Sequence, residues 1–280
     1  MKKKIKILVL LIAALAGFLY LQNNWIGVSK WELTFDKLPE NFDGFKVIHL
    51  SDLHSKFFGK NQQQLVTIIK KSEPDIIVIT GDLVDRKHYD EQAALSLVHQ
   101  AVKIAPVYFV MGNHEWWSGR FVNLEKQLVE AGVHVLRNNW QTIERDGQKI
   151  FVCGIDDPAA AGSQYDENGF IEEKLQETLT KISKDSFRLL LSHRPEKMPL
   201  YTQYEVDLVL SGHAHGGQFR IPFVGGIVAP DQGFFPQYTS GVYRDRDTTM
   251  VVSRGLGNSI IPQRIFNRPE VIDIVLNWGD

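Results

Sequence analysis

Short apolar runs alternate with amphipathic runs between residues 45 and 132. Runs rich in apolar and β-branched residues predict buried strands at 45–51, 75–80 and 106–112. Apolar residues that recur every three or four positions predict helices at 61–72, 90–104 and 122–132. Strands and helices that alternate at this spacing are typical of βαβ units, so this half of the chain predicts a largely parallel sheet.

The rest of the chain has a less regular pattern. Residues 22–44 are interpreted as a mainly polar linker, and helical spacing predicts a helix at 171–182. The pair Asp146-Gly147 predicts the turn of a β-hairpin at 142–155. Further strands are predicted at 187–193, 206–213 and 242–255. The pattern as a whole predicts a mixed α/β protein.

The N-terminus differs from the rest in composition. Lysines at positions 2, 3, 4 and 6 precede an uncharged, largely apolar run at 7–21. A basic start before such a run is typical of an export signal, and the run is shorter than the ~20 residues of an ordinary membrane span. Cleavage after Ala14–Ala16 is disfavoured because the apolar run continues beyond it. We therefore interpret the segment as an uncleaved signal-anchor, with a cleaved signal peptide as the alternative.

This interpretation divides the chain into a leader and linker at 1–28 and a main domain at 29–280. Because lysines favour the cytoplasmic side, the domain is expected at the outer face of a bacterial-type cytoplasmic membrane. It would be secreted if the leader were cleaved. A buried N-terminal helix is less favoured, since the apolar run has no polar face.

Composition excludes several function classes. The 280 residues carry a formal net charge of −2, so no nucleic-acid-binding module is expected, because such modules need a basic face. The single cysteine, Cys153, excludes an internal disulfide and a cysteine-rich zinc site. It lies in an apolar run, which favours a buried thiol. The sequence does not indicate an oligomeric state.

Residues with metal-ligand chemistry follow the predicted strands. Asp52 and His54 follow the first strand, Asp82 follows the second, and Asn113 and His114 follow the third. Two later strands are followed by His193, His213 and His215. Because ligands in open α/β sheets bind beyond the carboxyl ends of the strands, we expect these side chains to converge at one edge.

The residue types in this set indicate a site for two metal ions. Two aspartates, one asparagine and four histidines, without a thiolate, suit divalent ions such as Mn²⁺, Fe or Zn²⁺. The alternation within Gly212–Gln218 would let His213 and His215 each reach a different ion. The glycines there would allow a close approach of the backbone.

Five motifs together resemble those of the calcineurin-like metallophosphoesterases. They are D-x-H at 52–54, G-D at 81–82, G-N-H-E at 112–115, a lone His193 and G-H-x-H at 212–215. The similarity covers roughly residues 46–217. The tail at 253–271 resembles the membrane-associated, YkuE- and YaeI-like phosphodiesterase branch of that family. The resemblance implies a two-sheet αββα sandwich, whereas periodicity alone predicts only a mixed α/β domain.

The resemblance also implies a role for each matching residue. One divalent ion would be bound by Asp52, His54 and His215. The other would be bound by Asn113, His193 and His213. Asp82 would bridge the two ions, and a hydroxide between them would hydrolyse a phosphodiester or a phosphomonoester. His114 would be the general acid for the leaving oxygen, and the amide of Asn113 would also face the phosphate.

Aromatic residues crowd the loops around the predicted site. Trp116 and Trp117 are predicted to contact substrate, together with Phe57, Phe58, Phe234 and Phe235. Arg264, with Arg254 and Arg268, is predicted to meet an extra phosphate. With the N-terminal anchor, these residues favour a lipid-linked phosphoester at a membrane surface. Packing of the rings against one another is an equally open interpretation.

Two other functions stay open. One is a UDP-acyl-sugar pyrophosphatase of lipid precursor metabolism, and the other is a non-catalytic adaptor with the same fold. The complete ligand set argues against an adaptor. Among the other polar residues, Asp85 is interpreted as a carboxylate at a helix N-terminus, with a supporting position behind a metal ligand as the alternative, and His49 is interpreted as a core histidine. Asp156 and Asp157 are candidates for lining the site.

Overall fold

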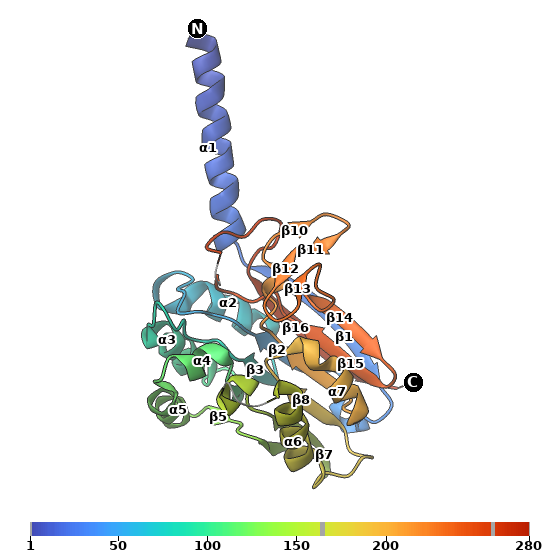
Figure 1. Ribbon diagram of the computed structural model, residues 1–280. Helices are drawn as coiled ribbons and strands as arrows, with labels where there is room; N and C mark the ends of the chain where they lie inside the picture. Colours follow the sequence, from blue (N-terminus) through green and yellow to red (C-terminus); the bar gives the residue numbers. More distant parts are fainter. Residues whose placement is uncertain (1, 163–165, 259–260, 280) are drawn as a thin grey trace.

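The computed structural model describes residues 2–162, 166–258 and 261–279, and it consists mainly of two β-sheets packed face to face (Figure 1). The first sheet has the order β1 (Gly27–Phe35), β16 (Glu270–Trp278), β2 (Phe45–Leu50), β3 (Ile76–Thr80), β4 (Val107–Val110) and β5 (His134–Val135). The second has the order β14 (Gly241–Asp245), β15 (Thr248–Val252), β9 (Leu208–Ser211), β8 (Arg188–Leu191), β7 (Gln148–Gly154) and β6 (Asn139–Arg145). Two short hairpins pair β10 (Arg220–Ile221) with β11 (Gly225–Gly226) and β12 (Val228–Ala229) with β13 (Gly233–Phe234).

The central strands of both sheets are parallel. In the first sheet β2, β3, β4 and β5 are parallel neighbours, and β16 joins them antiparallel to β2. In the second sheet β7, β8, β9 and β15 are parallel neighbours, with antiparallel β6 and β14 at the edges. Loops that follow parallel strands leave a sheet on the same side, so each sheet gathers several of its loops at one edge.

Helices cover both outer faces of the pair of sheets. The helices are α1 (Lys2–Asn24), α2 (Gln63–Ser72), α3 (Glu91–Ala101), α4 (Asn113–Trp117), α5 (Phe121–Glu130), α6 (Glu167–Leu179) and α7 (Met198–Gln203). Short 3-10 turns lie at Glu40–Phe42, Lys60–Gln62, Pro158–Ala161, Pro195–Lys197 and His215–Gly217. The helices α2, α3 and α5 pack on the first sheet, and α6 and α7 pack on the second. The predicted αββα sandwich is confirmed.

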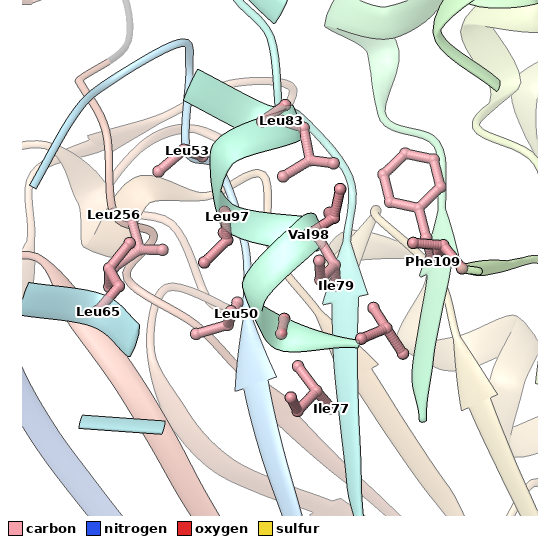
Figure 2. Packing of buried hydrophobic residues seen from close by; sticks show 14 of the residues in the cluster. Leu50, Leu53, Leu65, Ile77, Ile79, Leu83, Leu97, Val98, Phe109 and Leu256 are labelled. Carbon is pink, nitrogen blue, oxygen red and sulfur yellow. The ribbon is translucent and has the colours of Figure 1, made fainter. Parts of the chain in front are cut away.

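Strand β3 shows why residues 76–79 are all apolar. Ile77 and Ile79 face the helical side, where Figure 2 shows Ile79 beside Val98 of α3 and Ile77 further down the strand. Val78 faces the opposite way, into the core between the sheets. Successive side chains of a strand point to opposite faces, so a strand buried on both faces needs an unbroken apolar run.

The segment at 22–44 is not a linker. Residues 27–35 form β1, which pairs in parallel with β16, and both strands went unpredicted. The side chains of Leu33 and Phe35 are buried between the sheets. Strand β1 therefore begins at Gly27, before residue 29, where the main domain was expected to start. The domain boundary remains a prediction.

Helix α1 extends away from the sheets along most of its length (Figure 1). Its side chains are not buried, and its length and composition are sufficient to cross a membrane, as those of a signal sequence also are. Its apolar character explains why it does not pack as an amphipathic helix would.

Candidate metal centre

The strand ends of both sheets meet at one place. Asp52 and Asp82 each lie two residues beyond β2 and β3, and Asn113 begins α4 just after β4. From the second sheet, His193 lies two residues beyond β8, and His213 lies two residues beyond β9. The structure thus brings the predicted ligands together between the two sheets, where the loops of each reach the other.

A first group of donor atoms comes from Asp52, His54, Asp82 and His215, all buried. One candidate donor atom from each lies within 4.8 Å of those of the others. The Nε2 atoms of His54 and His215 are 3.0 Å apart. The Nε2 atom of His54 is 3.5 Å from Oδ2 of Asp82, and that of His215 is 3.3 Å from Oδ1 of Asp52. Two carboxylates and two imidazoles in this arrangement suit one divalent ion.

A second group lies beside the first and shares Asp82 with it. Its donor atoms come from Asp82, His193 and His213 and lie within 4.8 Å of one another. The Nε2 atom of His193 is 3.4 Å from Oδ2 of Asp82 and 3.2 Å from Nδ1 of His213. The Oδ1 atom of Asn113 lies 3.1 Å from the same Nε2. Because Asp82 belongs to both groups, the arrangement suits a pair of ions that share one carboxylate.

Glycines allow these loops to approach each other. A Cβ atom on Gly212 would lie 1.9 Å from Oγ of Ser51 and 2.5 Å from Oδ2 of Asp52. A Cβ atom on Gly112 would lie 2.3 Å from Oδ1 of Asp82. A larger residue at either position would force the ligand loops apart.

Several candidate ligands have unfavourable backbone conformations. Positive φ angles between 47° and 63° occur at Asp52, His54, Asp82, His213 and His215. For a residue other than glycine, the left-handed region costs on the order of 1 kcal/mol or more, and such residues cluster at functional sites. The surrounding loops hold these side chains in place at the expense of local backbone stability.

The buried carboxylates of the cluster require positive charge close to them. Burial alone would lower the pKa of His193, but the charge of Asp82 and its hydrogen bond outweigh burial and raise that pKa to about 10. Burial raises the pKa of Asp52, although nearby imidazoles act in the opposite direction. Charged carboxylates in a buried site require cationic partners. The donor set therefore fits divalent cations.

Glu115 joins two of the ligand loops through its buried carboxylate. Its Oε2 atom accepts hydrogen bonds from the backbone N–H of Asp82 at 2.7 Å and of Gly112 at 2.8 Å. Its Oε1 atom accepts one from the N–H of Val84 at 3.1 Å. The side chain is fully buried, so this role is internal and not at the surface.

A pocket of about 460 Å³ opens over the donor cluster. Its wall includes Asp82, Asn113, His213 and His215, together with His114. The Nδ1 atom of His114 accepts a hydrogen bond from the backbone N–H of Arg86 at 3.2 Å. In the neutral ring, this contact leaves Nε2 as the nitrogen that carries the proton.

Comparison with known proteins identifies the family of the chain. The sequence profile of the calcineurin-like phosphoesterases matches residues 45–217. The chain belongs to this family. It is 34% identical over 258 residues to the uncharacterised metallophosphoesterase YkuE of Bacillus subtilis, covering 90% of this chain and 86% of that protein. It is 29% identical over 268 residues to the phosphodiesterase YaeI of Escherichia coli, covering 93% of each chain.

Other similar proteins extend the comparison to animals and to solved structures. A transmembrane protein with a metallophosphoesterase domain from Danio rerio is 32% identical over 254 residues, which cover 88% of this chain and 56% of that protein. The crystal structure of the phosphopantetheinyl hydrolase PptH from Mycobacterium tuberculosis has a TM-score of 0.51 at 13% identity, over 77% of this chain and 91% of that one. The latter similarity concerns the fold alone.

As a metallophosphoesterase, the chain is a hydrolase of a family that depends on two metal ions. The apolar helix α1 and the transmembrane relatives suggest association with a membrane. The tail at 253–271, which resembles the membrane-associated branch, is described except for residues 259–260, which lie outside the described part of the chain.

Three polar groups in this phosphoesterase orient the histidines, and sequence reasoning offered only one of them, Asp85, as an alternative interpretation. Asp231 Oδ2 lies 2.9 Å from His213 Nε2, so the Nδ1 atom of His213 faces the cluster. The Nδ1 atom of His193 donates to the carbonyl oxygen of Thr80 at 2.6 Å. Asp85 Oδ2 lies 3.6 Å from His54 Nδ1. Such partners fix which nitrogen an imidazole presents to a metal ion.

The interpretation of Asp85 as a helix N-terminal carboxylate is wrong. Asp90 caps α3 instead, and Asp85 accepts the N–H groups of Lys87 and His88 within its own loop. The alternative interpretation, a position that supports a metal ligand, fits the contact of Asp85 with His54. Asp231 carries no comparable signal, because it does not follow a strand of either six-stranded sheet.

Asp156 and Asp157 pair with arginines. Neither of them is among the described residues that line this pocket. Asp156 contacts Arg137, with Oδ1 to Nε at 2.6 Å. Asp157 binds the buried Arg194 through two hydrogen bonds, and Arg194 in turn contacts Asp231. His49 is a core histidine as expected, with Nε2 2.8 Å from Oγ1 of Thr80.

The residues predicted to contact substrate have different surroundings. Trp117 lines the pocket and its ring lies 4.6 Å from the guanidinium of Arg86, whereas the exposed Trp116 is not among the described lining residues. Arg264 is buried, and all five of its N–H groups have acceptors inside the protein. These acceptors are the carbonyl oxygens of Gly257, Arg254 and Asn267 and the Nδ1 atom of His215. The phosphate contact expected of Arg264 does not fit this placement.

Proposed function

We propose that the chain hydrolyses a phosphodiester or a phosphomonoester at a two-metal site. The observation that carries the proposal is the grouping of seven oxygen and nitrogen donors into two sets that share Asp82. Asp52, His54 and His215 would complete one ion site with Asp82, and Asn113, His193 and His213 the other. When bound, two such ions activate a water molecule and neutralise charge on the phosphoryl oxygens.

The residues of the chain would supply the remaining steps. The amide of Asn113, at the pocket wall, would orient the phosphoryl group. His114 would donate a proton from Nε2 to the leaving oxygen while in its imidazolium form, which the carboxylate of Asp85, 3.4 Å from Nδ1, would stabilise, and the ring would become neutral. Asp231 and Asp85 would keep His213 and His54 in the orientations that face the ions.

The substrate proposed here is a phosphoester presented at a membrane, including lipid-linked ones. Trp117 offers an aromatic face at the pocket, and the side chains of Arg86 and Lys87 supply positive charge beside it. Helix α1, with its N-terminal lysines on the cytoplasmic side, would hold the catalytic domain at the outer face of the membrane.

The experiment that tests this function is metal analysis combined with a hydrolysis screen. The full chain, purified in detergent, is expected to hold two divalent ions and to hydrolyse bis(p-nitrophenyl) phosphate or p-nitrophenyl phosphate. A chelator should abolish turnover, and added Mn²⁺ or Zn²⁺ should restore it. Asp82→Asn should lose metal and activity together, because it alone belongs to both groups.

The matched control is Asp146→Asn, which makes the same chemical change in an exposed turn. A chain that binds fewer than two ions and hydrolyses none of these esters would instead be an adaptor. Preferential cleavage of a UDP-acyl-sugar would identify the pyrophosphatase alternative. Turnover that survives complete metal removal would contradict the two-metal proposal.

A further inference from the structure

Helix α1 is attached to the domain through a segment that we call the strap, residues 262–266. The side chain of Asn23 donates to the carbonyl oxygen of Pro262 at 2.9 Å and accepts from the N–H of Arg264 at 2.8 Å. These contacts hold the last turn of α1 against the domain. Only residues 25 and 26 separate α1 from β1, which limits the gap to about 10 Å. A membrane that contains α1 must therefore lie close to this side of the domain.

The strap reaches the level of the apolar part of α1. The rings of Phe18 and Phe266 meet edge to face with centroids 5.6 Å apart. Gln263 Nε2 donates to the carbonyl oxygen of Leu19 at 3.1 Å. Phe18 and Leu19 both belong to the apolar run that ends at Leu21. Phe266, whose side chain is 54% exposed, therefore lies at the depth of the last apolar turn of α1.

The strap also contacts the base of the β10–β11 hairpin. Phe219 and Ile265 form a parallel bridge, and the N–H of Arg220 donates to the carbonyl oxygen of Ile265 at 3.0 Å. From this base the hairpin projects a tip that contains Phe223, which is fully exposed, and Val224, which is 61% exposed. Figure 1 shows this hairpin beside the base of α1.

The β12–β13 hairpin adds two more exposed rings to the same region. The N–H of Phe235 donates to the carbonyl oxygen of Ile227, which follows β11, at 2.8 Å. Phe234 and Phe235 are 78% and 68% exposed. Rings this exposed are unfavourable in water, and a group of exposed apolar side chains in one region usually has a partner.

The scarcity of charged residues on these two hairpins favours a lipid surface as the partner. Between residues 219 and 235 the sequence has two charged residues, Arg220 and Asp231. Arg220 donates to the carbonyl oxygen of Gly216, and Asp231 is paired with Arg194 and His213. The projecting tips are therefore apolar and aromatic, which suits the interfacial region of a bilayer.

We propose that Phe223, Val224, Phe234, Phe235 and Phe266 form a membrane-docking surface that enters the bilayer crossed by α1. The inference rests on the part of the proposed function that places α1 in a membrane. It adds a second contact between the domain and the bilayer, which would fix the tilt of the domain.

Docking would also place the pocket beside the lipid. Asp231, which orients His213, lies in the turn between β12 and β13, three residues before Phe234. The β10–β11 hairpin packs directly on the histidine motif, since a Cβ atom on Gly217 would lie 2.4 Å from Cα of Gly226. A hairpin seated in the membrane would thus hold one wall of the pocket at the bilayer surface.

Site-directed fluorescence in liposomes tests the proposal. Cys153 is buried, and burial raises its pKa to about 12, so it should not react with a thiol probe at pH 7.5. Phe223→Cys, in the full chain, is labelled with an environment-sensitive fluorophore and reconstituted. Val122→Cys on α5 is the matched control, because Val122 is 82% exposed. Leu11→Cys reports on α1 itself.

Nitroxide-labelled lipids are expected to quench most of the fluorescence at 223 and little at 122, and aqueous iodide should show the reverse. Quenching at 11 but not at 223 would overturn the docking surface while leaving the anchor intact. Failure of lipid quenching at position 11 would contradict the anchor as well. A label at 223 protected from iodide but not quenched by lipid would mean that protein covers the surface, and would also overturn the proposal.

Discussion

A single backbone hydrogen bond determines which nitrogen of His114 can act in catalysis. Because the N–H of Arg86 occupies Nδ1, Nε2 is the nitrogen left for the substrate, and it can donate a proton only from the imidazolium form, since a neutral ring would become an anion. The neighbouring carboxylate of Asp85 lies 3.4 Å from Nδ1 and would stabilise the ring when it is protonated. These contacts thus orient His114, which contributes no donor atom to either of the two ligand groups that contain Asp82.

His114→Ala is expected to keep both metal ions but to lower turnover by about 10²–10⁴-fold for poor leaving groups. Esters with good leaving groups need little proton donation and should lose much less. The measurement is kcat for a series of aryl phosphoesters of rising leaving-group pKa. His99→Ala, in an exposed part of α3, is the control. An equal loss across the series would contradict the acid role.

Glu115 offers a second test at the scale of single residues. Glu115→Gln keeps the size of the side chain, but its amide group cannot accept all three N–H donors of Asp82, Gly112 and Val84. A buried donor left unpaired costs about 1–3 kcal/mol, and metal affinity should fall about 10–100-fold as the loops shift. Urea unfolding and metal titration measure the two effects.

The control for that change is Glu130→Gln, because the carboxylate of Glu130 is 63% exposed and pairs loosely with Lys126. It should alter neither quantity appreciably. If Glu115→Gln bound metal as tightly as the control, the carboxylate would not be what positions the ligand loops.

At the scale of elements, the sequence predicted the βαβ half of the fold well because its strands are buried on both faces. Ile77, Val78 and Ile79 are all apolar, and so they stand out from the amphipathic helices. Strand β1 was missed because it lies at a sheet edge and alternates exposed and buried residues within a polar segment. Its pairing with β16 joins positions more than 240 residues apart, which a local pattern cannot reveal.

Leu33→Ala tests whether β1 belongs to the folded core. The Leu33 side chain is 3% exposed and packs between the sheets, so the substitution should lower the free energy of unfolding by about 2–4 kcal/mol. The neighbouring Glu32→Ala, at an exposed position, should change it little. Equilibrium urea unfolding in detergent compares the two. Equal stabilities would mean that residues 27–35 act as a tether.

At the scale of the whole molecule, the candidate ligands could be predicted because they follow strands at regular spacing, and the structure brings them together. Of the residues that orient them, Asp231 could not be predicted, since it reaches His213 from a loop with no motif. The phosphate contact predicted for Arg264 does not fit its buried placement, for a related reason. An arginine in a loop can bind phosphate or backbone carbonyls, and only the fold determines which acceptors surround it.

The arrangement of ligands implies that metal ions link the two sheets. Asp52, His54 and Asn113 come from loops of the first sheet, and His193 and His213 from loops of the second. Ions held between them bind the folded state and not the unfolded chain. Each should therefore add about 2.7 kcal/mol at a free concentration 100 times its Kd, and chelation should lower the thermal midpoint of the whole domain.

Thermal unfolding of the full chain in detergent, with and without a chelator, measures this contribution. In Asp82→Asn the difference between the two conditions should largely vanish, because Asp82 contributes to both groups. In Asp146→Asn it should persist. If metal analysis found two bound ions while chelation left the midpoint unchanged, the ions would have to bind the unfolded chain equally well. They could then not be held by a cluster that exists only when the two sheets are packed together.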